Sequence, residues 1–367
     1  MNKSIEKNKK GIRVITTILG MVLLGIIVVS VVFFRGRLVE TKKLLASSEY
    51  ETYDNYYVMI TENRDSDYWR SIYNGALEEA KKNNAYVKLM GADLEDEFSK
   101  EDLLRMAIAS KVDGIIVEGD SVNKNVMLLK EADEAGIPVV TVEEDNTESQ
   151  RKSFIGVSGY NMGRDYGEQI CSYVKGAKLQ KCNVLVLVDN ISTSSLQSNV
   201  QTSTTQSIVI TAIKEVIDSY GLSNIISLES KTVTSNIDFA AEEEIRDIFV
   251  GQETLPNVIV CLSEKSTMCV SQAVVDYTVD YTKDSQVEIF GYYLSPTIEA
   301  AIKKNTIRSS IVVDTEQMGE FAVRALNEYK ESGYVSDYNY IDTSLVTKES
   351  LETSEQEGGD EDEQEAE

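Results

Sequence analysis

The sequence predicts an α/β protein with two doubly wound parallel sheets, and three observations lead to that prediction. Short apolar runs rich in Val and Ile recur along the chain, as is typical of strands buried on both faces. Segments with apolar residues at helical spacing lie between these runs. Strand–helix alternation indicates parallel strands joined by right-handed crossovers. Ten strands exceed one ordinary core, so we expect two sheets of about five.

The strands are predicted from ten apolar runs. They are Tyr57–Ile60, Val87–Met90, Gly114–Val117, Val139–Val142, Phe154–Val157, Val184–Val188, Ile225–Leu228, Val258–Cys261, Val287–Phe290 and Ile311–Val313. Residues between Trp69 and Ala80, and again between Phe321 and Tyr329, place apolar side chains on one helical face. Gly136-Ile137-Pro138 is typical of a helix end followed by a strand edge.

Two further segments have plain structural interpretations. The glycines of 156–163 have the wrong spacing for a dinucleotide-binding loop, and they indicate close helix packing or a turn in a hinge strand. The Ser/Thr-rich stretch 190–206 is interpreted as a surface loop that leads into a helix at 208–217.

The N-terminal region predicts a membrane anchor. Residues 14–34 are uncharged and mostly apolar, which is long enough to span a bilayer, and the basic residues of 1–13 favour a cytoplasmic N-terminus. A cleaved signal peptide is the alternative, but its apolar core is normally shorter and ends at a small-residue site. We therefore expect a single-pass cell-membrane protein, with a juxtamembrane linker at 35–54 and the bulk of the chain extracytoplasmic.

Composition excludes several classes of function. The net charge of −25 disfavours nucleic acid as a partner, and residues 349–367, with ten acids and no base, are predicted to be a disordered acidic tail. The chain has no histidine, which removes the serine triad and nearly all zinc chemistry. Its four cysteines lack C-x-x-C spacing and are interpreted as buried hydrophobes, although an oxidising exterior permits disulfides. We expect no enzyme activity, no metal and no cofactor.

Polar residues just beyond the predicted strands mark a cleft, because parallel α/β sheets bind ligands at the carboxyl ends of their strands. Two aromatic residues, Tyr68 and Trp69, lie at the start of the first predicted helix and form a second group of candidates. The candidate ligand-binding residues are Tyr68, Trp69, Glu118, Glu143, Glu144, Ser158, Ser263, Tyr292 and Tyr293.

Several local motifs, taken in order, resemble one family. They are Asp67-Tyr68-Trp69 with Gly75-Ala76, Val112–Val117, Ala135–Val140, Ile155–Val157 leading to Gly163-Arg164, Phe290-Gly291-Tyr292, and Ile341–Lys348. The chain resembles periplasmic sugar-binding proteins of the ribose-binding type, which share their fold with the effector-binding core of lactose-repressor-like regulators. The resemblance covers about residues 55–348.

The resemblance implies two lobes joined by a three-strand hinge that close on a ligand. By that pattern, lobe one comprises 55–157 and 314–342, and lobe two comprises 158–313 and 343–348. The family's aromatic wall, which stacks on sugar rings, maps to Tyr68 and Trp69. Trp69 also fits a plain core role at the start of its helix.

The site departs from the sugar-binding pattern. Glu118 stands where Asn is usual, Glu143-Glu144 replaces Asp-Arg, and Ser158-Gly159 replaces Asp-Asn. Ser263 and Tyr292-Tyr293 also differ from the family's residues. Carboxylates beside tyrosines favour a cationic or amino-bearing ligand, through ion pairing and cation–π contact. A degenerate cleft that serves protein contacts is the alternative.

These features predict a membrane-anchored extracytoplasmic solute-binding protein. Its expected ligand is a sugar-like small molecule that can carry an amino group, and its expected partner is an ABC permease or a sensor histidine kinase. The alternative is an anchored protein-interaction module with a degenerate cleft. The lack of a readable nucleophile–base pair disfavours an enzyme. The predicted membrane span and the lack of a basic helix-turn-helix exclude a transcription factor.

Overall fold

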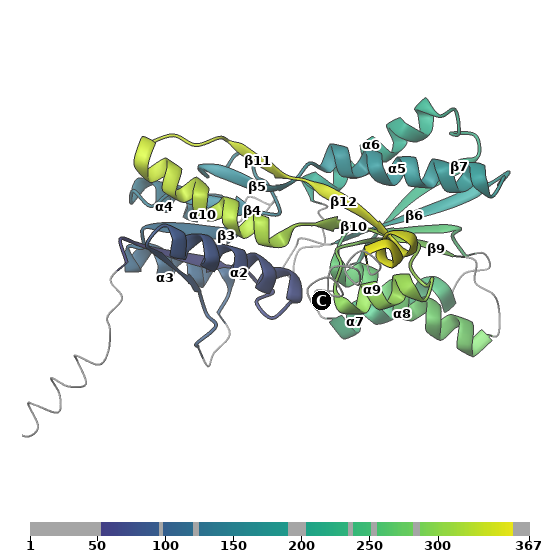
Figure 1. The fold of residues 1–367 in the computed structure, drawn as a ribbon, viewed down its shortest axis with the longest axis horizontal. Coiled ribbons are helices and arrows are strands. Elements are labelled where there is room, and N and C mark those ends of the chain that lie inside the picture. Colours follow the sequence, from purple (N-terminus) through teal and green to yellow (C-terminus); the bar gives the residue numbers. More distant parts are fainter. Residues whose placement is uncertain are drawn as a thin grey trace, which may run out of the picture. The chain divides into compact units, whose positions relative to one another are not determined.

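The computed structural model describes residues 53–94, 98–119, 125–189, 203–233, 238–250, 255–281 and 287–354. These residues form two six-stranded sheets, both flanked by helices (Figure 1). The predicted α/β class with two parallel-sheet lobes is therefore confirmed.

Lobe one is built on the sheet with strand order β11-β5-β4-β3-β1-β2, and its strands pair in parallel. Its elements are β1 (Asn55–Ile60), α2 (Asp67–Lys82), β2 (Ala85–Leu89), α3 (Lys100–Ser110), β3 (Gly114–Glu118), α4 (Val126–Glu134), β4 (Val139–Val142), β5 (Ser153–Val157), α10 (Thr315–Ser332) and β11 (Tyr338–Ile341). Helices α2 and α10 pack on one face of this sheet, and α3 and α4 supply the core of the other.

Lobe two is built on the sheet with strand order β12-β10-β9-β8-β6-β7. Its elements are α5 (Gly159–Gly176), β6 (Cys182–Asp189), α6 (Thr204–Ser219), β7 (Ile226–Val233), α7 (Asp238–Val250), β8 (Val258–Cys261), α8 (Glu264–Tyr281), β9 (Glu288–Tyr292), α9 (Pro296–Lys303), β10 (Ser309–Val313) and β12 (Thr343–Thr347). Helices α5 and α6 belong to the core on one face, and α7, α8 and α9 to the core on the other.

The chain passes between the two sheets three times, after β5, after β10 and between β11 and β12 (Figure 1). Each of the ten predicted runs overlaps a strand. Strands β11 and β12 were not among those runs, because each carries two exposed residues and forms no continuous apolar segment. Strand β12 also departs from the parallel pattern, since it pairs antiparallel with β10.

Helices α2 and α10 approach each other at backbone distance. A Cβ added to Gly75 would lie 1.9 Å from the carbonyl oxygen of Glu316, and one added to Gly319 would lie 1.9 Å from that of Ile72. Both distances are far inside van der Waals contact. Only glycine therefore fits at these two crossing points.

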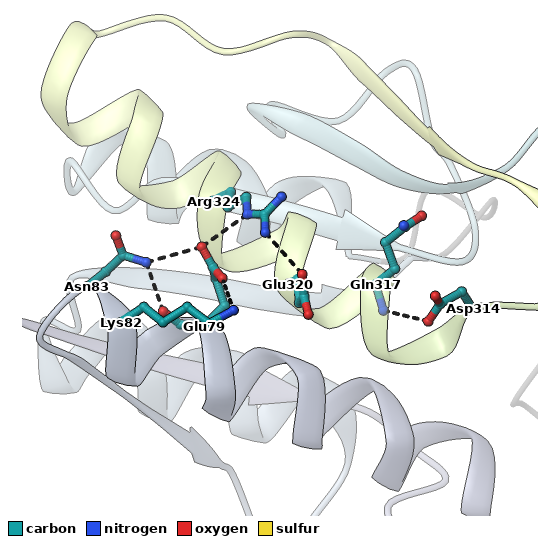
Figure 2. A network of polar contacts seen from close by, with 7 residues as sticks. All are labelled: Glu79, Lys82, Asn83, Asp314, Gln317, Glu320 and Arg324. Carbon is teal, nitrogen blue, oxygen red and sulfur yellow. Dashed lines mark hydrogen bonds and ion pairs between the residues drawn. The ribbon is translucent and has the colours of Figure 1, made fainter. Parts of the chain in front are cut away.

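Glu79 of α2 bridges the two helices beyond this crossing (Figure 2). Its Oε1 accepts a hydrogen bond from Arg324 Nε of α10 at 3.0 Å, and its Oε2 lies 3.0 Å from Lys82 Nζ. Arg324 also pairs with Glu320, and the nearby first turn of α10 is capped by the Asp314 carboxylate, which accepts from the Gln317 N–H at 2.9 Å. Burial raises the pKa of the Glu79 carboxyl, but its hydrogen-bonded cations outweigh that effect and leave the pKa below its ordinary value.

The second helix pair, α5 and α6, uses glycine in the same way. A Cβ on Gly163 would lie 2.5 Å from the carbonyl oxygen of Val209, and one on Gly167 would lie 2.7 Å from Val216 Cβ. The close-packing interpretation of Gly163 is thereby confirmed. This packing also fixes the start of α6 beside the point where the chain leaves β5.

The structure contradicts the predicted membrane location. In the part of the chain that the structure describes, no helix is long and apolar enough to cross a bilayer. The described helices instead combine a buried face with a charged one, as α5 does with its exposed Arg164–Glu168 pair. The predicted span at 14–34 lies outside the described residues, as does everything before Tyr53.

Two other sequence predictions concern the acidic tail and the four cysteines. Residues 348–354 are helical, so the predicted disordered tail does not begin at 349, and Leu351 packs against the core of lobe two. Residues 355–367 lie outside the described part. All four cysteines are buried and free, as the buried-hydrophobe interpretation expects.

The α2–α10 crossing gives a stability prediction. Gly319→Ala should lower the free energy of unfolding by about 1–3 kcal/mol, because the new methyl group must force two helix backbones apart. Urea unfolding followed by circular dichroism measures this. Gly176→Ala, at the end of α5 with no atom within 4 Å of the new Cβ, is the matched control and should be neutral or stabilising. Equal effects of the two variants would contradict the account.

Candidate functional site

Glu118 and its neighbours form the lobe-one side of the candidate site. Glu118 ends β3, and its Oε2 accepts hydrogen bonds from Thr61 Oγ1 at 2.9 Å and from the Glu62 N–H at 2.7 Å. Lys100, almost fully buried, places its Nζ 3.8 Å from Glu62 Oε1. The carboxylate of Glu118 is therefore held in place by the end of the neighbouring strand β1.

Glu143 and Tyr293 occupy equivalent places in the two lobes. Each directly follows the third strand of its sheet order, β4 or β9, and each adopts a left-handed backbone, with φ of 73° and 69°. Their N–H groups donate to the adjacent strand, to Ile155 O at 2.9 Å and to Ile311 O at 2.8 Å. For side-chain-bearing residues this conformation costs on the order of 1–3 kcal/mol, and such strain clusters at functional sites. The matched strain marks both positions as candidate ligand contacts.

Tyrosines from the two lobes meet directly. Tyr68, in the first turn of α2, places its hydroxyl 3.4 Å from that of Tyr292, and its ring centroid lies 5.2 Å from that of Tyr293 in an edge-to-face arrangement. Trp69 packs edge-on against Tyr68 at 5.9 Å. All four rings are buried and belong to one core cluster that extends across both lobes.

Glu143 lies at the centre of an acidic cluster. Burial is the main reason that its pKa is raised well above the ordinary value, and repulsion from Glu118, Glu144 and Asp189 adds to it, while Lys100 opposes. Burial also raises the pKa of the Glu144 carboxyl to about 7, against the effect of hydrogen bonds from Ser203 and Thr205. The structure therefore brings three predicted carboxylates together.

Asp189, at the end of β6, is a member of this cluster that was not among the predicted site residues. Its Oδ1 accepts from Ser263 Oγ at 3.2 Å, and its Oδ2 accepts from Gln206 Nε2 at 3.1 Å. Burial raises its pKa. The signal that could have found it is its place immediately after an apolar run, which is also the place of Glu118.

The two predicted serines differ in the partners that they bond. Ser158 Oγ caps α5 by accepting from the Asn161 N–H at 3.3 Å, which explains a serine there without a ligand. Ser263, by contrast, bonds to Asp189 and so belongs to the acidic cluster. Glu144 accepts from Ser203 Oγ, which lies across the lobe boundary.

Within the described ranges, no group of three or more Cys, Asp and Glu side chains has an arrangement that could hold a metal ion. The carboxylates are instead poised to receive protons or an organic cation, and the tyrosine faces suit a ring or an ammonium group.

Comparison with known proteins agrees with this architecture. Residues 57–333 match the model of the family described as periplasmic binding protein domain, which is more than half of the chain. The chain belongs to that family. No curated protein sequence matches it significantly.

Three solved structures illustrate the similarity. GanP, a glucose-galactose binding protein from Geobacillus stearothermophilus, is 23% identical with a TM-score of 0.68, covering 82% of this chain and 99% of its own. The XylFII-LytSN complex is 22% identical with a TM-score of 0.64, and the match covers 81% of this chain and 99% of that one. A galactofuranose binding protein is 16% identical with a TM-score of 0.66, and the match covers 82% of this chain and 96% of that one. At these identities the likeness shows the fold. GanP and the galactofuranose binding protein are sugar-binding proteins by name.

The raised pKa of Glu143 predicts a pH-dependent stability difference. Folded wild-type protein keeps this proton at pH values where the unfolded chain has lost it, so its free energy of unfolding falls as pH rises above the ordinary carboxyl range. Glu143→Gln cannot ionise and should be more stable than wild type at pH 8, with little difference between the two at pH 4. Thermal unfolding at both pH values measures this.

Glu148→Gln is the control for that comparison, because Glu148 is an exposed acid in the same loop. It should track wild type at both pH values. A Glu143→Gln variant that is less stable than wild type at pH 8 would show that the ionised carboxylate is favourably paired.

Proposed function

We propose that this protein is a solute-binding protein that takes up a small sugar-like ligand carrying an amino group between its two lobes. The observation that carries the proposal is the cluster of Glu118, Glu143, Glu144 and Asp189 beside the tyrosines of both lobes. The family, and the similarity in fold to a glucose-galactose binding protein and a galactofuranose binding protein, support the general class.

The charge of the cluster supports the ligand class. Carboxylates brought together in a partly buried space repel one another, and either protons or a cation must compensate them. An ammonium group supplies that charge and makes charge-assisted hydrogen bonds to the oxygens. Once the lobes open, the rings of Tyr68 and Tyr293, which are buried in this structure, would offer faces for the sugar or for the cation.

A membrane protein partner completes the proposal, either an ABC permease that imports the ligand or a sensor histidine kinase that reports it. One similar structure was solved as a complex with a second protein, LytSN, which supports a protein partner for this fold. The proposal includes no catalytic step.

A protein-interaction module with a degenerate cleft is the second candidate. The contact between the Tyr68 and Tyr292 hydroxyls favours it, since side chains of the two lobes fill the space where a ligand would lie. In that case the lobes would serve contacts with another protein rather than with a small molecule.

The ligand proposal is tested by thermal shift and calorimetry of the full chain against neutral sugars, amino sugars and simple amines. We expect an amino sugar to raise the melting temperature and the matching neutral sugar to have little effect. Glu143→Gln should weaken amino-sugar binding by about tenfold or more, because a charge-assisted bond is lost. Glu148→Gln should bind as wild type does.

Two results would overturn the ligand class. Tight binding of a neutral sugar, unchanged in Glu118→Gln and Glu143→Gln, would show that the carboxylates do not select the ligand. A flat response to every compound in the panel would favour the interaction module.

A further inference from the structure

A continuous hydrogen-bonded chain crosses from lobe one to lobe two at Glu144. Ser203 Oγ, in lobe two, donates to Glu144 Oε1, and the Gln206 N–H donates to Ser203 Oγ at 3.2 Å. The Gln206 side chain then donates to Asp189, which also accepts from Ser263. The loop after β4 is thereby linked to the ends of β6 and β8.

Both ends of this chain are fixed by backbone packing. On the lobe-one side, a Cβ on Gly119 would lie 1.6 Å from the carbonyl oxygen of Glu144, so the end of β3 holds the Glu144 backbone closely. On the lobe-two side, Ser203 is buried and is the N-cap of α6, and a Cβ on Gly159 would lie 2.9 Å from the Thr205 carbonyl oxygen. Glu144 thus meets a rigidly held helix start.

From this geometry we propose that Glu144 and Ser203 form an interlobe latch, in which protonation of Glu144 holds the lobes closed when no ligand is bound. The latch goes beyond the proposed function, because it acts without a ligand and does not depend on which ligand the protein takes.

The surroundings of Glu144 decide the sign of the pH dependence. The charged and titratable groups that face it are Glu143 and Asp145 of its own loop, and Asp189 and Tyr292 of lobe two. These acids all disfavour a negative charge on Glu144. Asp145 is itself paired with Arg151, whose Nε lies 2.5 Å from Asp145 Oδ1. Burial and this repulsion outweigh the bonds from Ser203 and Thr205, and the pKa of Glu144 rises to about 7 in the closed state.

Opening the lobes returns Glu144 to water and to an ordinary carboxyl pKa. Between that ordinary value and about 7, the closed state therefore holds a proton that the open state has released. The closed-to-open ratio should fall as pH rises through this window, by up to about tenfold per pH unit for one proton, and level off above it.

Distance measurements between the lobes test the latch on the full chain without ligand. Spin labels at Met127→Cys in α4 and Val275→Cys in α8 report lobe separation by pulsed dipolar spectroscopy, since both positions are exposed. We expect the short-distance population to shrink between pH 5 and pH 8. Glu144→Gln still accepts the Ser203 bond but cannot ionise, and it should keep the short distance at pH 8.

The serine variants separate the latch from helix capping. Ser203→Ala should reduce the short-distance population at pH 5, and Ser203→Thr should restore it because the hydroxyl remains. Ser295→Ala is the matched control, since Ser295 caps α9 by the same bond, to Ile298 N at 3.4 Å, within lobe two. It should retain the wild-type distances. An unchanged pH dependence in Glu144→Gln, or a Ser203→Ala distribution equal to that of wild type, would overturn the latch.

Discussion

Repulsion between carboxylates at the lobe boundary is the constraint on which the site depends. The strand ends of two parallel sheets meet there, and this chain places Glu118, Glu143 and Glu144 on one side and Asp189 on the other. Such a set cannot be fully ionised and buried without a compensating charge. The protein's response is visible in the raised pKa values of Glu143, Glu144 and Asp189. In the two proposals above, ligand choice and lobe closure both follow from how that charge is compensated.

Close packing of the helices holds the residues around the carboxylates in fixed positions. Glycines at the α2–α10 and α5–α6 crossings bring helix backbones into contact, which positions Tyr68 at the start of α2 and Ser203 at the start of α6. The strained backbones of Glu143 and Tyr293 are tied to the neighbouring strands by single hydrogen bonds. The strained conformations persist because the surrounding sheet holds these two residues in place.

Much of the fold could be predicted from the sequence, because buried parallel strands leave continuous apolar runs such as Val139–Val142. Strand β11 could not, since its exposed Tyr338 and Tyr340 break the pattern. In the site, strand-end position was enough to bring Glu118, Glu143, Tyr292 and Tyr293 to the same boundary, whereas Tyr68 comes from the first turn of α2. The proposed role of Glu144 depends on Ser203, 59 residues further along the chain, and no local pattern encodes that contact. Asp189 has the positional signal, but its hydrogen bonds to Gln206 and Ser263 exist only in the folded protein.

Proton exchange on ligand binding tests the central claim most directly. Titration calorimetry of an amino sugar at pH 6, in buffers with different ionisation enthalpies, counts the protons released per ligand bound. The account predicts net proton release, because an ammonium group stabilises the ionised carboxylates of Glu143 and its neighbours and lowers their pKa values. Binding of the amino sugar with no proton exchange, together with equal affinity for the matching neutral sugar, would contradict it.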